Sequence, residues 1–308
     1  MEVPTTFRAM SLFDRRLLVT AGKGGVGRST ITAALALAAS KRGKRVLVCE
    51  VNVQERISGL LGVRATGNTI GRVAHGVDAV VVRPDEAMRE YGLMKLRYQA
   101  VYKAVFENPF VSRFLHFIPS LPELVMLGKI LFHARQGPWD LVLVDGPATG
   151  HGITFLGVPQ ALLDTIPPGS MRSEAEWMRD FLRDPRTTAV NLVALPEELP
   201  VNETMELAAA TRGRLGMTLG GAFLNRFVAR RFSDEERTRL PAGTGHAAFD
   251  PALRAARAHG IRSDMSGRYL DRLQRDLPVS VTPLPLLHPA RDFGRESIEE
   301  LARHMAAL

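Results

Sequence analysis

Short apolar runs alternate with longer helical stretches along most of the chain. Nearly continuous apolar strands separated by helices are typical of a parallel sheet that is covered on both faces. The pattern therefore predicts an α/β fold with a mostly parallel central sheet flanked by helices. The expected strands are residues 17–20, 45–51, 79–82, 140–145, 191–195 and 220–225, and the run 279–284 is a weaker candidate because proline interrupts it.

Three helical stretches are longer than simple connections between strands, at residues 85–118, 169–184 and 233–277. The third begins with Ser-Asp-Glu-Glu, which predicts a capping box between Ser233 and Glu236. We expect one domain over residues 1–308, with a helical subdomain made of additions at about 85–135, 160–188 and 230–277. Their apolar stripes favour packing into a core, and a groove for a client protein is the alternative.

Composition is that of a globular protein, with 308 residues of which 45% are hydrophobic and 23% charged. The single cysteine, Cys49, lies within an expected strand, which excludes a disulfide framework and favours a small core residue. No apolar stretch precedes the first strand, so we expect a cytoplasmic protein without membrane insertion. The net charge of +8 permits an acidic partner, but the basic residues are scattered, which favours an ordinary surface and no specific nucleic acid.

The stretch AGKGGVGRST, residues 21–30, has the spacing of a phosphate-binding loop, G-x-x-x-x-G-K-[ST], between an expected strand and an alanine-rich helix. Glycines let backbone N–H groups converge on phosphate oxygens, and the helix N-terminus adds partial positive charge. Ser29 is placed to bind Mg²⁺. We therefore expect ATP and Mg²⁺ as cofactors. The expected binding residues are Gly22, Lys23, Gly24, Gly25, Val26, Gly27, Arg28, Ser29 and Thr30.

Arg28 departs from the pattern, which has lysine at this position. Lysine is a compact charge, whereas arginine is a planar fork that can bind phosphate with two hydrogen bonds but needs more space. Nucleotide binding is expected, while the rate of hydrolysis is left open.

The segment KGGVGRST resembles the deviant Walker A motif of dimeric ATPases such as MinD, ParA, the nitrogenase iron protein, ArsA and the tail-anchored-protein-targeting ATPases. In that class the first lysine reaches the phosphates bound by the other subunit. The resemblance implies that Lys23 is a catalytic residue acting across a dimer interface. It also implies a homodimer, or a heterodimer with a related ATPase.

A second motif narrows the resemblance to ArsA and the tail-anchored-protein-targeting ATPases. Residues 145–162, DGPATGHGITFLGVPQAL, are similar to the family's switch II, which implies that Asp145 binds Mg²⁺ directly or through water. Residues 223–226 resemble the strand end whose asparagine contacts adenine, so Asn225 is the expected base contact. Residues 283–287 resemble the late loop over the adenine, which includes Pro285.

The segment equivalent to the family's switch I is altered. Aligned on residues 46–62, Asn52 takes the place of the aspartate that positions the attacking water, so it is the third expected catalytic residue beside Lys23 and Asp145. Asparagine can hold a water but cannot accept its proton. Glu50 and Glu55 are nearby carboxylates that could substitute, and Asn52 could also be a simple strand-end residue.

These observations leave three functions open. The first is a dimeric ATP hydrolase that couples a nucleotide-driven switch to a client protein. The second is an ATP-binding subunit that hydrolyses poorly because of Arg28 and Asn52, acting as a regulator or scaffold in a heteromeric complex. A DNA-binding ATPase of the ParA type is the third and least favoured. A single phosphate loop and a single cysteine argue against metalloid export and against a cysteine-based zinc clamp.

Overall fold

The computed structural model describes residues 11–51, 54–96, 120–147, 149–241, 246, 248–289 and 292–308. Asn52 and residues 97–118 of the expected helical stretch 85–118 lie outside the described residues.

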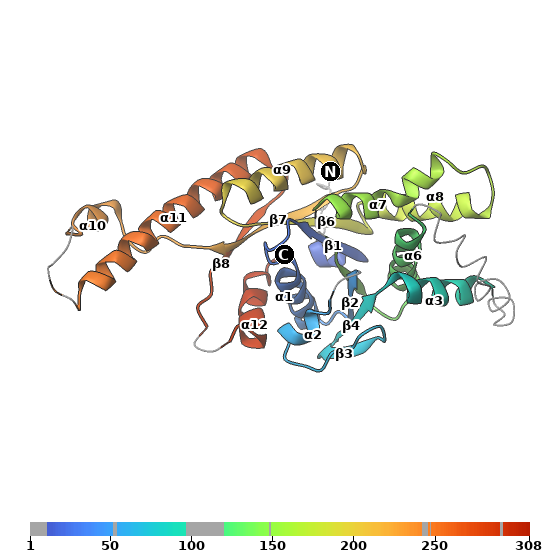
Figure 1. Cartoon of the computed structure of the whole chain (residues 1–308), viewed down its shortest axis with the longest axis horizontal. Coiled ribbons are helices and arrows are strands. Elements are labelled where there is room, and N and C mark those ends of the chain that lie inside the picture. The colour runs from blue at the N-terminus through green and yellow to red at the C-terminus, as the bar shows by residue number, and fades with distance from the viewer. Residues whose placement is uncertain are drawn as a thin grey trace, which may run out of the picture.

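The core of the molecule is an eight-stranded sheet with the order β3-β4-β2-β5-β1-β6-β7-β8 (Figure 1). All neighbouring strands are parallel except β3, which pairs antiparallel with β4. The predicted α/β fold with a mostly parallel sheet is confirmed. The strands are β1 (Leu17–Gly22), β2 (Val46–Val51), β3 (Gly71–Ala74), β4 (Val77–Val82), β5 (Leu141–Asp145), β6 (Thr188–Ala194), β7 (Leu219–Phe227) and β8 (Val281–Pro285).

Every strand expected from the sequence is present, including the proline-interrupted β8. That strand lies at the edge of the sheet, where a residue without a backbone N–H is tolerated. Strand β3 was not predicted. It is four residues long and only half of it is buried, so it lacks the apolar run that identified the others.

Helices cover both faces of this sheet (Figure 1). Residues of α1, α2 and α12 form one hydrophobic cluster, and residues of α6 to α9 and of α11 contribute to a second cluster on the opposite face. Strand β1 contributes side chains to both clusters, because Leu17 and Val19 belong to the second cluster and Leu18 belongs to the first. The described helices are α1 (Arg28–Lys41), α2 (Ile57–Leu60), α3 (Pro84–Leu96), α6 (Leu121–Gln136), α7 (Thr149–Leu163), α8 (Ser170–Arg183), α9 (Glu198–Gly213), α10 (Asp234–Thr238), α11 (Asp250–Asp276) and α12 (Arg295–His304), preceded by a 3₁₀ turn at Leu12–Asp14.

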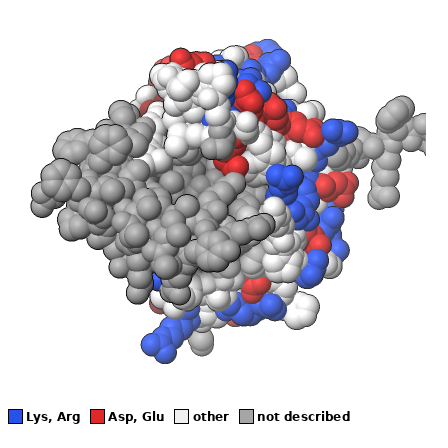
Figure 2. All heavy atoms as spheres, turned by 90° about the vertical axis from the view of Figure 1, so that its right-hand side faces the viewer, with Lys and Arg blue, Asp and Glu red and all other residues white. Residues whose placement is uncertain are grey.

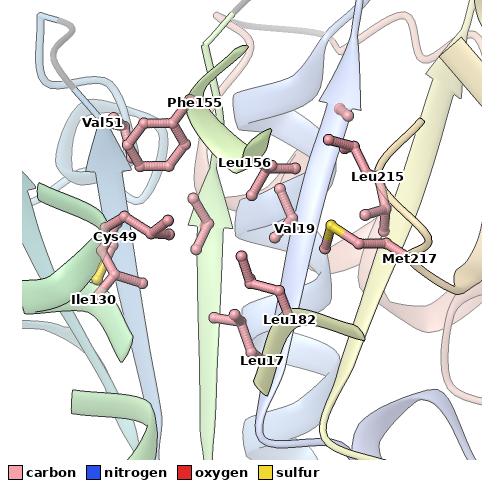
Figure 3. Close-up of a cluster of buried hydrophobic side chains, with 14 of the residues drawn as sticks. Leu17, Val19, Cys49, Val51, Ile130, Phe155, Leu156, Leu182, Leu215 and Met217 are labelled. Atoms are coloured by element: carbon pink, nitrogen blue, oxygen red, sulfur yellow. The ribbon is translucent and has the colours of Figure 1, made fainter. Parts of the chain in front are cut away.

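Cys49 lies inside the second cluster, among side chains that include Ile130 and Phe155 (Figure 3). It is fully buried, and this burial raises the pKa of its thiol to about 12. The side chain therefore behaves as a small hydrophobic residue, as predicted.

The prediction of a capping box at the start of α10 is confirmed. Ser233 and Glu236 form the capping box of α10, with the Ser233 hydroxyl accepting from the Glu236 N–H at 3.2 Å and the Glu236 carboxylate accepting from the Ser233 N–H at 2.8 Å. Helix α11 then extends far from the sheet (Figure 1), and only four of its residues, Gly260, Ser263, Ser266 and Leu273, are buried.

On the face shown in Figure 2, basic and acidic side chains of the described residues are interspersed. Within the part of the chain that the structure describes, no helix has both the length and the apolar character needed to cross a membrane.

Candidate functional site

The loop between β1 and α1 has the backbone of a phosphate cradle. Gly25 and Gly27 adopt left-handed conformations, with φ of +88° and +96°, which residues with a Cβ rarely adopt. A Cβ at Gly27 would also overlap the side-chain amide of Asn225, and one at Gly22 would lie 2.6 Å from the Val193 carbonyl oxygen of β6. A Cβ on Gly24 would meet nothing within 4 Å, so this side of the loop is open.

Ser29 and Asp145 meet beside this loop. The Ser29 hydroxyl, in the first turn of α1, donates to Asp145 Oδ2 at 2.5 Å, because β1 and β5 are adjacent parallel strands whose carboxyl ends share one edge of the sheet. Asp145 is 4% exposed, and its Oδ1 is buried without a hydrogen-bond partner. Burial raises the pKa of Asp145, opposed by the Ser29 hydrogen bond and by the charge of Arg28.

These two groups fit Mg²⁺. The ion takes hard oxygen ligands and is commonly held by one or two protein groups together with phosphate and water oxygens. The unpartnered Oδ1 of Asp145 and the hydroxyl of Ser29 supply such oxygens next to the phosphate loop. Both residues predicted to bind the metal are therefore together, and their role stays a prediction.

Arg28 connects the phosphate loop to the segment that follows β5. Its guanidinium donates to the carbonyl oxygen of Gly146, the residue directly after Asp145. Partial burial lowers the pKa of Arg28, and the Asp145 carboxylate opposes this shift. The side chain is thus engaged with the segment that resembles switch II.

Lys23 is bonded to a different part of the chain than Arg28 is. Its ammonium group forms an ion pair with Glu203 of α9, with Nζ and Oε1 2.8 Å apart. Both side chains are partly exposed, and the other oxygen of Glu203, Oε2, is buried without a hydrogen-bond partner. In this conformation Lys23 pairs within its own chain.

The two residues predicted to contact the base lie at the ends of neighbouring parallel strands, β7 and β8. Asn225 is buried, donates from Nδ2 to the Val26 carbonyl oxygen at 2.8 Å, and accepts from the Arg226 N–H at 2.9 Å. Its amide therefore braces the phosphate loop. Pro285 ends β8 and lines a separate pocket of about 590 Å³ together with His288. Contact of either residue with a base stays a prediction.

The carboxylates near the predicted switch I have backbone partners. Glu50 is fully buried, and its Oε1 accepts from the N–H groups of Arg56 at 2.7 Å and Ile57 at 3.3 Å, while Oε2 has no partner. Burial raises the pKa of Glu50 to about 7, although the two N–H groups act against the shift. Glu55 accepts from the N–H groups of Thr66 and Gly67 at 2.7 and 2.8 Å.

A pocket of about 420 Å³ opens over the phosphate loop. Its lining combines the loop with residues that the sequence did not single out, Arg56 and Phe293. Both sequence signals were weak, since one is a lone arginine after a strand and the other a lone aromatic residue in a loop. The lining residues are Gly25, Gly27, Arg28, Ser29, Thr30, Glu55, Arg56, Gly59, Leu60 and Phe293.

Comparison with known proteins defines the class. Residues 15–167, which contain the phosphate loop and the Asp145 segment, match the family described as Anion-transporting ATPase. The chain therefore belongs to the ArsA-like ATPase family, and this membership implies nucleotide binding.

The similar proteins include ATPase BagA of Mycobacterium tuberculosis, which is 29% identical over 239 residues, covering 74% of this chain and 70% of that protein. A protein named "Putative arsenical pump-driving ATPase" from Halobacterium salinarum is 23% identical over 309 residues, covering 92% of this chain and 44% of its own length.

Proposed function

We propose that this chain is a single-domain cytoplasmic ATPase that binds Mg·ATP at residues 22–30, works as a dimer, and passes a nucleotide-driven change of conformation to a client or partner protein. In the hydrolytic step a water attacks the terminal phosphorus, giving ADP and phosphate. No specific nucleic acid is expected to take part.

The observation that carries this proposal is the meeting of Ser29 and Asp145 beside the glycine loop, with one carboxylate oxygen of Asp145 buried and unpartnered. A buried acceptor without a partner is costly unless it serves another group. Mg²⁺ bound with a nucleotide would supply that partner, and it would neutralise charge on the phosphates when present.

The coupling to conformation is supported by Arg28. Its hydrogen bond to the Gly146 carbonyl joins the phosphate loop to the segment that follows Asp145. An arginine that turns from this carbonyl to a phosphate releases that segment. Loops that respond to the terminal phosphate in this way are a common form of nucleotide switch.

Dimerisation involves Lys23 in this proposal. The lysine leaves Glu203 and reaches the phosphates of the other subunit when two chains close on nucleotide. The ion pair with Glu203 supports a separated state in which the lysine is held in place by its own chain.

The second candidate is an ATP-binding subunit with little hydrolysis of its own, paired with a related ATPase. The observation that favours it is again Arg28, since a guanidinium that donates to the Gly146 carbonyl has fewer N–H groups left to bind a phosphate. In this reading the chain holds nucleotide and the partner supplies the better catalytic residues.

Phosphate release at saturating Mg·ATP separates the two candidates, with the double variant Arg28→Lys plus Asn52→Asp for comparison. Turnover by the natural chain that the double variant does not accelerate supports the hydrolase. Nucleotide binding without turnover, with turnover restored in the double variant, supports the second candidate. Absence of nucleotide binding by the natural chain would contradict both.

A further inference from the structure

Arg56 lines the pocket over the phosphate loop from a different element than the loop itself. It directly precedes α2, beyond the carboxyl end of β2, and it shares the pocket with Gly25, Arg28 and Ser29. Its side chain is exposed, so a molecule bound in the pocket can reach it.

The charge of Arg56 affects two groups of the site, Arg28 and Asp145. It contributes to a lowered pKa at Arg28, after the larger effect of burial, and it opposes the burial-driven rise in the pKa of Asp145. The guanidinium therefore lies within electrostatic range of both Arg28 and Asp145, the carboxylate proposed to bind Mg²⁺. A phosphate group bound between these residues would lie within range of Arg56 as well.

Arg56 differs from the other two cations of the site in its bonding. Lys23 is paired with Glu203, and Arg28 donates to the Gly146 carbonyl. Among the residues that the structure describes, no group accepts a hydrogen bond from the Arg56 guanidinium. Of these three cations, Arg56 is the one that can meet an incoming anion without first giving up a partner within the described chain.

The backbone that presents Arg56 is fixed at both sides. The buried carboxylate of Glu50 accepts the Arg56 N–H at 2.7 Å, which ties the residue to the end of β2. The preceding Glu55 accepts the N–H groups of Thr66 and Gly67, which ties it to the loop before β3. When the backbone is already held in place by hydrogen bonds, binding through its side chain costs less conformational freedom than binding through a side chain on a loose loop.

We propose that Arg56 contacts the terminal phosphate of a nucleoside triphosphate bound to the same chain and so makes the site prefer triphosphate over diphosphate. This inference rests on the proposed nucleotide site. Its chemical basis is the planar guanidinium, which can form two charge-assisted hydrogen bonds to a phosphate. Some nucleotide hydrolases use an arginine supplied by their own chain in this way.

The test is equilibrium binding of fluorescent ADP and of a fluorescent, non-hydrolysable ATP analogue, both with Mg²⁺, to the full chain. Arg56→Ala should weaken binding of the ATP analogue about tenfold or more while changing ADP binding less than about twofold. Arg56→Lys should bind the ATP analogue more weakly than the natural chain and more tightly than Arg56→Ala. Arg64→Ala removes the same charge from an exposed position just after α2, and it should change neither affinity.

The possible results are distinguishable. If the natural chain binds both nucleotides and Arg56→Ala weakens both equally, or weakens neither, the role in reading the terminal phosphate is overturned while the nucleotide site stands. If the natural chain binds neither nucleotide, the proposed function fails and this inference fails with it. Thermal unfolding of each variant checks that an altered affinity reflects the site and not a loss of folded protein.

Discussion

The phosphate loop, residues 22–30, and the segment of residues 54–67 both contribute to the pocket over the loop but are built in opposite ways. In the loop, the glycine backbone is fixed and the cationic side chains are already engaged, Lys23 with Glu203 and Arg28 with Gly146. In the segment, buried or half-buried carboxylates hold the backbone and leave the Arg56 side chain without a partner among the described residues.

The difference teaches how the site can respond to nucleotide. If Lys23 and Arg28 bind phosphate as proposed, they must first give up Glu203 and the Gly146 carbonyl, and we expect α9 and the segment after β5 to change. The segment at Arg56 needs no such exchange. Conformational response is therefore expected from the loop side, and discrimination between nucleotides from the Arg56 side.

The largest effect is expected at Gly27. Gly27→Ala puts a Cβ where φ is +96° and where the Asn225 amide lies, so it should lower the free energy of unfolding by roughly 2–4 kcal/mol and abolish nucleotide binding. Urea denaturation measures the first and nucleotide titration the second. Gly24→Ala is the matched control, because a Cβ there meets nothing, and its stability should stay close to that of the natural chain. Equal losses in both variants would show that the loop is less tightly fixed than described.

The second prediction concerns Glu50 and pH. The pKa of Glu50 is about 7 in the folded chain, whereas its ordinary value of 4.5 applies to the unfolded chain. The folded form therefore holds the proton more tightly and is favoured at low pH. Stability from this group is complete below pH 4.5 and is lost as pH rises through 7.

Glu50→Gln removes this titration and should gain stability relative to the natural chain by roughly 3 kcal/mol between pH 4.5 and pH 8, as an upper value. Urea unfolding of the nucleotide-free protein in a metal chelator measures it. Glu206→Gln, at an exposed position on α9, controls for loss of one carboxylate. A stability difference that does not change with pH would contradict the burial of a titrating carboxyl group at this position.

The smallest effect is expected at the ion pair of the loop. Glu203→Ala removes a partly exposed partner of Lys23, so it should cost about 0.2–1 kcal/mol of stability and less at high salt. Because it frees Lys23, it should also raise the dimer fraction with a non-hydrolysable ATP analogue, measured by light scattering after size exclusion. Glu206→Ala, at an exposed position one turn later on α9, should leave the dimer fraction unchanged. A lower dimer fraction in Glu203→Ala would reverse the role given to this pair.

The sequence predicted those parts of the molecule whose signals are local. Glycine spacing, a buried strand and a following helix identified the phosphate loop, and apolar runs identified seven of the eight strands. Strand β3 was missed because it has only four residues, of which two are buried, and so carries no apolar run. The proximity of Ser29 and Asp145 followed from strand ends sharing one sheet edge.

Contacts between distant segments could not be predicted. Lys23 and Glu203 are 180 residues apart, and nothing near either residue points to the other. The hydrogen bond of Asn225 to the Val26 carbonyl depends on the packing of β7 against the loop, so the sequence suggested only the contact with a base. Arg56 was missed because a lone arginine after a strand carries no motif, and only the folded chain places it in the pocket over the loop.

The most direct measurement of the central claim is the Mg²⁺ dependence of ATP binding to the natural chain and to Asp145→Asn, determined by equilibrium titration with and without the metal. The account predicts that Mg²⁺ tightens binding to the natural chain and that Asp145→Asn loses most of this gain while still folding. Equal binding with and without Mg²⁺, or the same gain in the variant, would contradict the assignment of the Ser29–Asp145 site to a metal–nucleotide complex.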